Sequence, residues 1–178
     1  MRALLLPLIC LTASALPAQE RAISSDLIET LDSGVVCAPP TTGEKLAPDT
    51  IAGVTHLIDT DPPFVSTKNR VPAVLGIGFG VKSSVRLPDG LAGVTMTITH
   101  PSIGPEGITQ QSFQTSISGG GQSLTFYQFD YDYEMQTGDW LMEASLDGIP
   151  LYAVAFEVVL PQQIPELAQV CGFENLLS

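Results

Sequence analysis

Short runs of alternating hydrophobic and polar residues follow one another along the chain, and most are bounded by Gly, Pro, Asn or Asp. The alternation is clearest where Val94, Met96 and Ile98 interleave with threonines. Because successive side chains of a strand point to opposite faces, this pattern indicates a strand with one buried face. Seven or eight strands are predicted, over residues 27–37, 51–58, 74–87, 92–100, 109–118, 124–133, 140–146 and 151–160.

Turn sequences between these runs predict antiparallel neighbours. Asp147-Gly148 separates the last two runs, and Asp-Gly is preferred in type I′ hairpin turns because both residues need a positive φ. Residues 38–50, with three prolines, and residues 59–70 are predicted loops. Many short strands without an amphipathic helix of ten residues favour an all-β sandwich or barrel.

Residues 124–133 predict a strand with an aromatic face and an acidic face. Alternation places four aromatic residues on the core side, Tyr127, Phe129, Tyr131 and Tyr133. The opposite face carries Gln128, Asp130, Asp132 and Glu134. Calcium accepts such carboxylates, so the three acidic residues are weak candidate metal ligands. Met135 and Leu141 stand where an EF-hand loop needs Gly and Glu, so we favour a solvated strand face and predict no metal site.

Residues 1–18 have the layout of a secretory signal peptide. Arg2 precedes an apolar run over residues 3–11, and small residues follow. Cleavage after Ala15 and cleavage after Ala18 both fit, and we favour Ala18. A membrane anchor is the alternative, but the run is shorter than the roughly 20 helical residues that cross a bilayer. We therefore expect a periplasmic or secreted protein without a membrane anchor after cleavage.

The predicted mature chain, residues 19–178, is long enough for one domain. We divide it into an N-terminal extension over residues 19–70, a sandwich core over residues 71–160 and a C-terminal tail over residues 161–178. In the tail, residues 164–170 are expected to form a short helix after Pro165.

Cysteine usage indicates one disulfide. Of three cysteines, Cys10 leaves with the signal peptide, and Cys37 and Cys171 remain. Two cysteines in an oxidising compartment predict a structural bridge between them, with intermolecular pairing or free thiols as alternatives. Cys10 would be the lipid site of a lipoprotein, but Ile9 precedes it where a small residue is usual.

Acidic residues dominate the charge of the chain. Asp and Glu number 19 against 7 Lys and Arg, which gives a formal net charge of −12. Phosphate backbones are bound through Lys and Arg, so the charge argues against nucleic acid as a partner. Cationic partners or divalent ions remain open, and solubility alone is the simplest interpretation of the acidity.

Few residues carry a recognisable chemistry. His56 and His100 are the only histidines and have no zinc-ligand spacing, so a hydrogen-bonded structural His100 is favoured over a catalytic base. Trp140 falls on an inward strand position, which favours core packing over a sugar-stacking platform. The glycines of residues 76–80 resemble a phosphate loop, but Val81 replaces the required Gly, and close strand packing explains them better.

Between residues 76 and 160 the order of several short motifs resembles a family. The motifs are FGV, THP, a Gly-rich turn, YQFD, GDWLMEASLDGIPL and FEVV. The resemblance is to an exported bacterial family known as domain of unknown function 3859. It implies an immunoglobulin-like antiparallel β-sandwich and supplies no functional residues.

Two classes of function are compatible with these observations. The first, which we favour, is a noncatalytic module that binds an envelope protein or peptide through a sheet edge or end loops. The second is a carbohydrate-binding or hydrolytic domain, which requires a cleft near His100, Trp140 or the acidic residues. The sequence predicts no catalytic residue and no cofactor, and leaves the binding residues open, with His100 and Trp140 as weak candidates.

Overall fold

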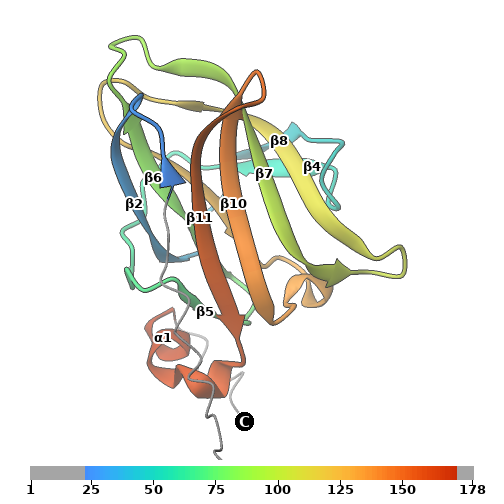
Figure 1. Ribbon diagram of the computed structural model, residues 1–178. Helices are drawn as coiled ribbons and strands as arrows, with labels where there is room; N and C mark the ends of the chain where they lie inside the picture. The colour runs from blue at the N-terminus through green and yellow to red at the C-terminus, as the bar shows by residue number, and fades with distance from the viewer. Residues whose placement is uncertain (1–22, 172–178) are drawn as a thin grey trace, which may run out of the picture.

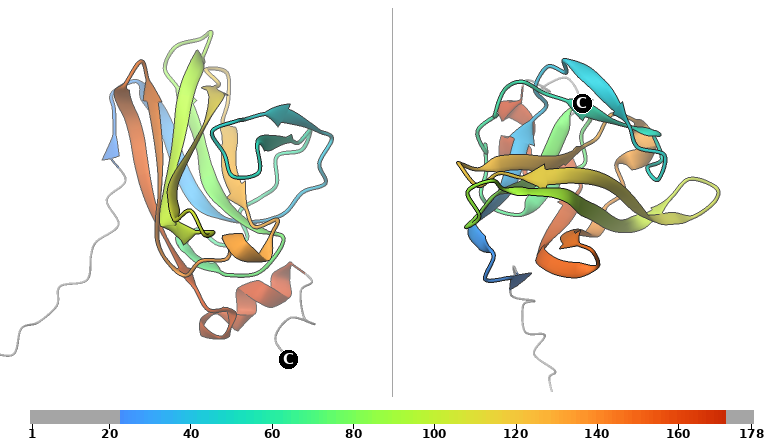
Figure 2. Two further views of the ribbon diagram at one scale, coloured as in Figure 1. Left: turned by 90° about the vertical axis from the view of Figure 1, so that its right-hand side faces the viewer. Right: turned by 90° about the horizontal axis from the view of Figure 1, so that it is seen from above.

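The structure, a computed structural model, describes residues 23–171. The predicted signal peptide and both of its candidate cleavage sites lie outside the described residues. Within them, two sheets pack face to face and a small hairpin lies beside them (Figures 1 and 2). No helix of the described chain is long and apolar enough to cross a membrane.

The larger sheet forms the front layer of Figure 1. Its strand order is β1, β11, β10, β7 and β8, and β5 extends it by pairing in parallel with the end of β11. All its other pairings are antiparallel. The bounds are β1 Ile23–Ser24, β5 Arg70–Pro72, β7 Leu91–Ile103, β8 Ile108–Ile117, β10 Gly138–Leu146 and β11 Ile149–Val159.

The smaller sheet has the order β2, β6, β9 and forms the second layer. Its strands are β2 Ile28–Cys37, β6 Ile77–Val85 and β9 Ser123–Gln128. A separate hairpin consists of β3 Gly43–Leu46 and β4 Val54–Leu57. The helical segments are the 3₁₀ turns η1 Asp132–Glu134 and η2 Pro161–Gln163 and the short helix α1 Pro165–Val170.

The core lies between the two sheets, and β6 is almost wholly buried in it. Phe79 of β6 is fully buried and packs on aromatic rings of the larger sheet, with ring centres 5.5 Å from Trp140 and 4.8 Å from Phe156. Burying a side chain of this size stabilises the fold by roughly 1.5–3 kcal/mol. One continuous core therefore joins both layers into a single domain.

Glycines of β6 allow the neighbouring strand to approach closely. A Cβ atom on Gly80 would overlap the carbonyl oxygen of Thr125 and the backbone of Phe126. A Cβ on Gly78 would meet the carbonyl oxygen of Tyr127 at 2.9 Å. The interpretation as strand glycines is confirmed for Gly78 and Gly80, whereas Gly76 lies just before β6 with a φ of 75°.

The predicted hairpin turn at the end of the domain is also confirmed. Asp147 and Gly148 have φ angles of 49° and 79°, as a type I′ turn requires. β10 and β11 pair on either side of this turn, from Leu146 opposite Ile149 to Gly138 opposite Val158. Asp147 carries the positive φ that aspartate tolerates better than most residues.

The disulfide between Cys37 and Cys171 is present, with the two Cα atoms 5.4 Å apart. Cys37 is the last residue of β2, and Cys171 directly follows α1. The bridge therefore fastens the C-terminal helix to the smaller sheet. The short helix predicted over residues 164–170 is confirmed by α1.

The number and bounds of the strands differ from the sequence prediction. The seven longer strands correspond to predicted runs, and three strands of two to four residues add to the prediction, β1, β3 and β5. The predicted strand over residues 51–58 covers only Val54–Leu57, and Gly43–Leu46 is a strand where a loop was predicted. β3 is largely exposed, so no hydrophobic alternation marks it.

The predicted strand over residues 124–133 is wrong beyond Gln128. The chain leaves the sheet and forms η1, so Tyr131 and Tyr133 are 49 % and 41 % exposed instead of lying in the core. Glu134, predicted on a solvated face, is only 4 % exposed. Tyr127 and Phe129 do pack against the core as predicted.

A candidate binding cavity at the open side of the sandwich

The sandwich is open between the edges of its two sheets. Within residues 23–171, β8 ends the larger sheet and pairs only with β7, and β9 ends the smaller sheet and pairs only with β6. The β3–β4 hairpin lies beside these two edges (Figure 2). Together β8, β9 and the hairpin enclose a cavity of about 560 Å³, which we call the seam cavity.

The walls of the seam cavity are mixed in polarity. Phe113 of β8 and Leu124 and Phe126 of β9 supply apolar surface. Polar side chains come from all three walls, among them Lys45, Thr55, His56, Gln111, Thr115, Gln128 and Asp130. Ligand sites in proteins commonly measure about 300–1,000 Å³ and combine apolar walls with a few polar groups. The seam cavity has both properties.

A buried polar network joins the two sheets at this cavity. The Gln111 side-chain oxygen accepts a hydrogen bond from the Ile51 amide at 2.8 Å. Its Nε2 lies 3.1 Å from His100 Nε2 and donates to the Tyr127 hydroxyl at 3.4 Å. Tyr127 in turn donates to Glu134 at 2.8 Å. The network therefore runs from β7 and β8 in the larger sheet to β9 in the smaller sheet and on to the 3₁₀ turn η1.

The hydrogen bonds determine the tautomer of His100. Gln111 Nε2 can only donate, so His100 Nε2 accepts, and Nδ1 carries the proton that it donates to the Pro101 carbonyl at 2.8 Å. Burial lowers the pKa of His100 below its ordinary value, against the opposing effect of the hydrogen bond with Pro101. The neutral imidazole ring, with one donor and one acceptor nitrogen, therefore satisfies both hydrogen bonds of His100.

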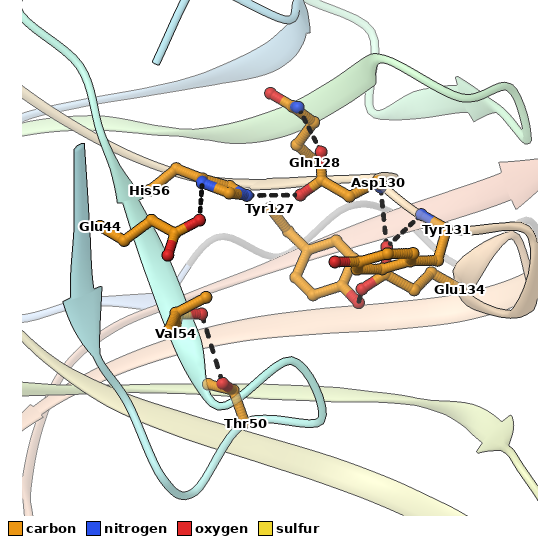
Figure 3. Close-up of polar contacts among 9 residues, drawn as sticks. All are labelled: Glu44, Thr50, Val54, His56, Tyr127, Gln128, Asp130, Tyr131 and Glu134. Atoms are coloured by element: carbon orange, nitrogen blue, oxygen red, sulfur yellow. Dashed lines mark hydrogen bonds and ion pairs between the residues drawn. The ribbon is translucent and has the colours of Figure 1, made fainter. Parts of the chain in front are cut away.

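Burial also raises the pKa of the Glu134 carboxyl, while its hydrogen bonds with Tyr127 and with the amides of Asp130 and Tyr131 act in the opposite direction. Those amides donate to Glu134 at 2.7 and 3.0 Å (Figure 3). Burial and the nearby Glu134 charge raise the pKa of Tyr127. The side chains of His100, Tyr127 and Glu134 are thus each hydrogen-bonded to partners inside the protein.

The hairpin is attached mainly to β8. The Ser112 amide donates to the Asp49 carbonyl at 3.1 Å, and the Ile51 amide bonds to Gln111. Lys45 Nζ lies 3.4 Å from the Gln114 carbonyl oxygen. These contacts make the hairpin and β8 one wall of the cavity.

On the side of β9, the hairpin is connected through His56 of β4. His56 Nε2 lies 3.0 Å from Asp130, and Nδ1 lies 4.0 Å from Glu44 of β3 (Figure 3). Asp130 also accepts a hydrogen bond from Gln128 at 2.6 Å. The imidazole therefore lies between two carboxylates at the wall of the cavity.

Some of the residues singled out from the sequence are buried in the core, and others line the seam cavity. Trp140 is 1 % exposed, donates from Nε1 to the Gln136 carbonyl at 2.9 Å and lies 4.9 Å from the His100 ring. Core packing of Trp140 and a hydrogen-bonded His100 are thus confirmed, and neither side chain lines the cavity. Asp130 and Glu134 do line it, whereas the exposed Asp132 does not.

Across residues 23–171, no group of three or more His, Cys, Asp or Glu is arranged to hold a metal ion. Asp130 and Glu134 are instead bound by His56 and by Tyr127. The concave pocket that the sequence set as the condition for a carbohydrate-binding or hydrolytic domain exists beside these two acidic residues. Trp140 does not line it, but packs behind the lining residue Tyr127, with ring centres 5.1 Å apart.

The sequence did not point to Gln111 or His56 as residues of a site. Gln111 lies within a polar run, Thr109 to Ser112, in which nothing distinguishes a buried side chain from exposed ones. His56 was noted only for lacking a zinc spacing. Both become site residues because distant segments meet, residues 51–56 with β8 and with the end of β9.

Comparison with solved structures places the fold in a known class. A crystal structure of an immunoglobulin-like protein from Pseudomonas aeruginosa is 18 % identical and matches with a TM-score of 0.51, over 80 % of this chain and 99 % of that chain. At this identity the likeness concerns the fold alone. The protein is therefore an immunoglobulin-like antiparallel β-sandwich, as predicted.

The family is shown by the sequence itself. The family model described as Domain of unknown function (DUF3859) matches residues 27–158, so the chain belongs to this family. The match confirms the resemblance seen over residues 76–160 and extends it to β2 and the hairpin. No curated protein matches the chain.

Proposed function

We propose that this protein is an exported binding module that holds an extended peptide segment in the seam cavity, along the free edge of β9. Within the described chain, the backbone hydrogen bonds of residues 124–128 run to β6 alone. An edge strand presents unpaired N–H and C=O groups on its outer side. This free edge beside a cavity is the observation that carries the proposal.

Backbone pairing explains why a peptide is favoured as the ligand. An extended peptide adds a strand to an exposed edge through main-chain hydrogen bonds, and pockets beside the edge receive alternate side chains. The seam cavity supplies such a pocket next to β9. The polar side chains of Gln111, Tyr127 and Glu134 in its wall already bond to one another, so they favour a site that binds a ligand over one that reacts with it.

Export to the periplasm or outside the cell is part of the proposal. The predicted signal peptide supports it, and the Cys37–Cys171 disulfide is of the kind that persists in oxidising compartments. The acidic net charge disfavours nucleic acid and is compatible with a peptide partner.

A peptide pool screened by NMR tests the proposal. Short random peptides, capped at both ends, are expected to shift the amide signals of residues 124–128. Thr115→Trp would fill the cavity from the β8 wall and is expected to abolish these shifts. Thr97→Trp makes the same change on β7, outside the cavity lining, and is the control that retains binding. Peptides that leave β9 unperturbed in the wild-type protein would refute the proposed function.

A further inference from the structure

We propose that the bound peptide carries a lysine or arginine, whose cation takes the place of His56 beside Asp130. This inference rests on the proposed function and names the chemistry of its ligand. The geometry around Asp130 supports it, together with the charge of the whole chain.

Asp130 is a carboxylate at the cavity wall whose side-chain partners are a histidine and a glutamine. Its side chain is 29 % exposed, and it lies two residues after Gln128, the last residue of β9. One oxygen bonds to His56 and the other to the neutral amide of Gln128. Within the described part of the chain, no lysine or arginine forms an ion pair with it. The permanent positive charge of a lysine or arginine is thus absent beside Asp130 in the described chain.

Glu44 provides a second carboxylate on the other side of the same ring. It lies 4.0 Å from His56 Nδ1, and that nitrogen is buried without a hydrogen-bond partner in the described structure. An ammonium or guanidinium group has three or five donors and can bond to both carboxylates at once. The imidazole therefore occupies the position that a stronger cation would fill.

The other charged groups of the cavity do not compete for this position. Lys45 is directed to the Gln114 carbonyl on the β8 wall. The carboxylate of Glu134 is held by Tyr127 and by two backbone amides. A formal net charge of −12 attracts cationic peptides over a longer range. The cationic side chain would thus be directed to Asp130 while the peptide backbone pairs with β9.

Pools of capped hexapeptides that differ only at one central residue test the inference on the full exported chain. The central residue is lysine, arginine, norleucine or glutamate, and binding is followed by the amide shifts of residues 124–130. The lysine and arginine pools are expected to bind at least about tenfold more tightly than the norleucine pool, as for a charge-assisted hydrogen bond. The glutamate pool is expected to bind most weakly.

The outcomes separate this inference from the proposed function. Equal binding of all pools at β9 would leave peptide binding intact and overturn the cation requirement. If no pool shifts the β9 signals, both proposals fail. Norleucine binding more tightly than lysine would overturn the inference alone.

Two test variants, with a third as their control, locate the cation. Asp130→Asn is expected to remove the preference for lysine over norleucine, and Asp132→Asn, on the same segment but outside the cavity, to retain it. His56→Ala is expected to tighten binding of the lysine pool more than of the norleucine pool, because the competing group is gone. An equal gain for both pools would mean that His56 restrains the hairpin instead of standing in for the ligand. Thermal melting verifies that each variant is folded.

Discussion

The carboxylate of Glu134 accepts hydrogen bonds from the backbone amides of Asp130 and Tyr131 and from the Tyr127 hydroxyl. These three donors reverse the chain after Phe129 and produce η1. As a consequence Tyr131 and Tyr133 turn outward and stack on each other, with ring centres 5.2 Å apart. One buried side chain thus overrides an alternating pattern that predicts a longer strand.

At the same scale, His100 is expected to make stability depend on pH. The pKa of His100 in the folded protein lies below the ordinary 6.5. As pH falls through 6.5, this histidine therefore becomes protonated in the unfolded chain before it does so in the folded protein. Wild-type stability therefore declines on acidification through this window. His100→Gln removes that contribution, and at neutral pH it is expected to cost about 1–3 kcal/mol through the disturbed network.

Urea unfolding of both proteins between about pH 5 and about pH 8 measures this difference. The destabilisation by His100→Gln should be largest above pH 6.5 and should shrink as pH falls. A pH-independent difference would show that the histidine titrates alike in the folded and unfolded states.

At the scale of elements, β6 depends on glycine for its contact with β9. Gly80→Ala places a methyl group against the carbonyl of Thr125 and the backbone of Phe126. Backbone cannot move aside as a flexible side chain can, so we expect a destabilisation of about 1–3 kcal/mol or more, measured by urea unfolding. Gly120→Ala is the control, because no atom lies within 4 Å of its Cβ position. Its expected change is within about 0.5 kcal/mol. Similar losses for both variants would argue against this close packing.

The hairpin is the element that sequence patterns described least well. No residue of β3 or β4 is fully buried, and the position of the hairpin follows from a few polar contacts with β8 and with Asp130. By contrast, the β10–β11 hairpin was predicted correctly because Asp147-Gly148 determines the turn locally. Local sequence signals therefore predicted the β10–β11 hairpin, which has a specific turn. They missed the β3–β4 hairpin, which is held in place by residues distant in the sequence.

At the scale of the whole molecule, the disulfide joins residues 134 positions apart. Closing so long a loop restricts the unfolded chain, and the chain-entropy model assigns it about 5 kcal/mol. The double variant Cys37→Ser and Cys171→Ser is expected to lower the melting temperature markedly. Reductant should lower it for the wild-type protein and leave the double variant unchanged. If reductant that reaches the disulfide leaves the melting temperature of the wild-type protein unchanged, the bridge does not stabilise the fold.

The sequence by itself determined the all-β class, most of the long strands and the type I′ turn, through local conformational preference and alternation against one buried face. It favoured the pairing of Cys37 with Cys171 on the premise that Cys10 leaves with the predicted signal peptide, and the structure decided this pairing. The seam cavity and the networks around Gln111 and His56 were decided by tertiary structure. They depend on which sheet edges remain unpaired and on contacts between residues more than 50 positions apart, such as Ile51 with Gln111 and His56 with Asp130. Periodicity along the chain carries no information about such encounters, because they are determined by how two sheets and a hairpin pack together in space.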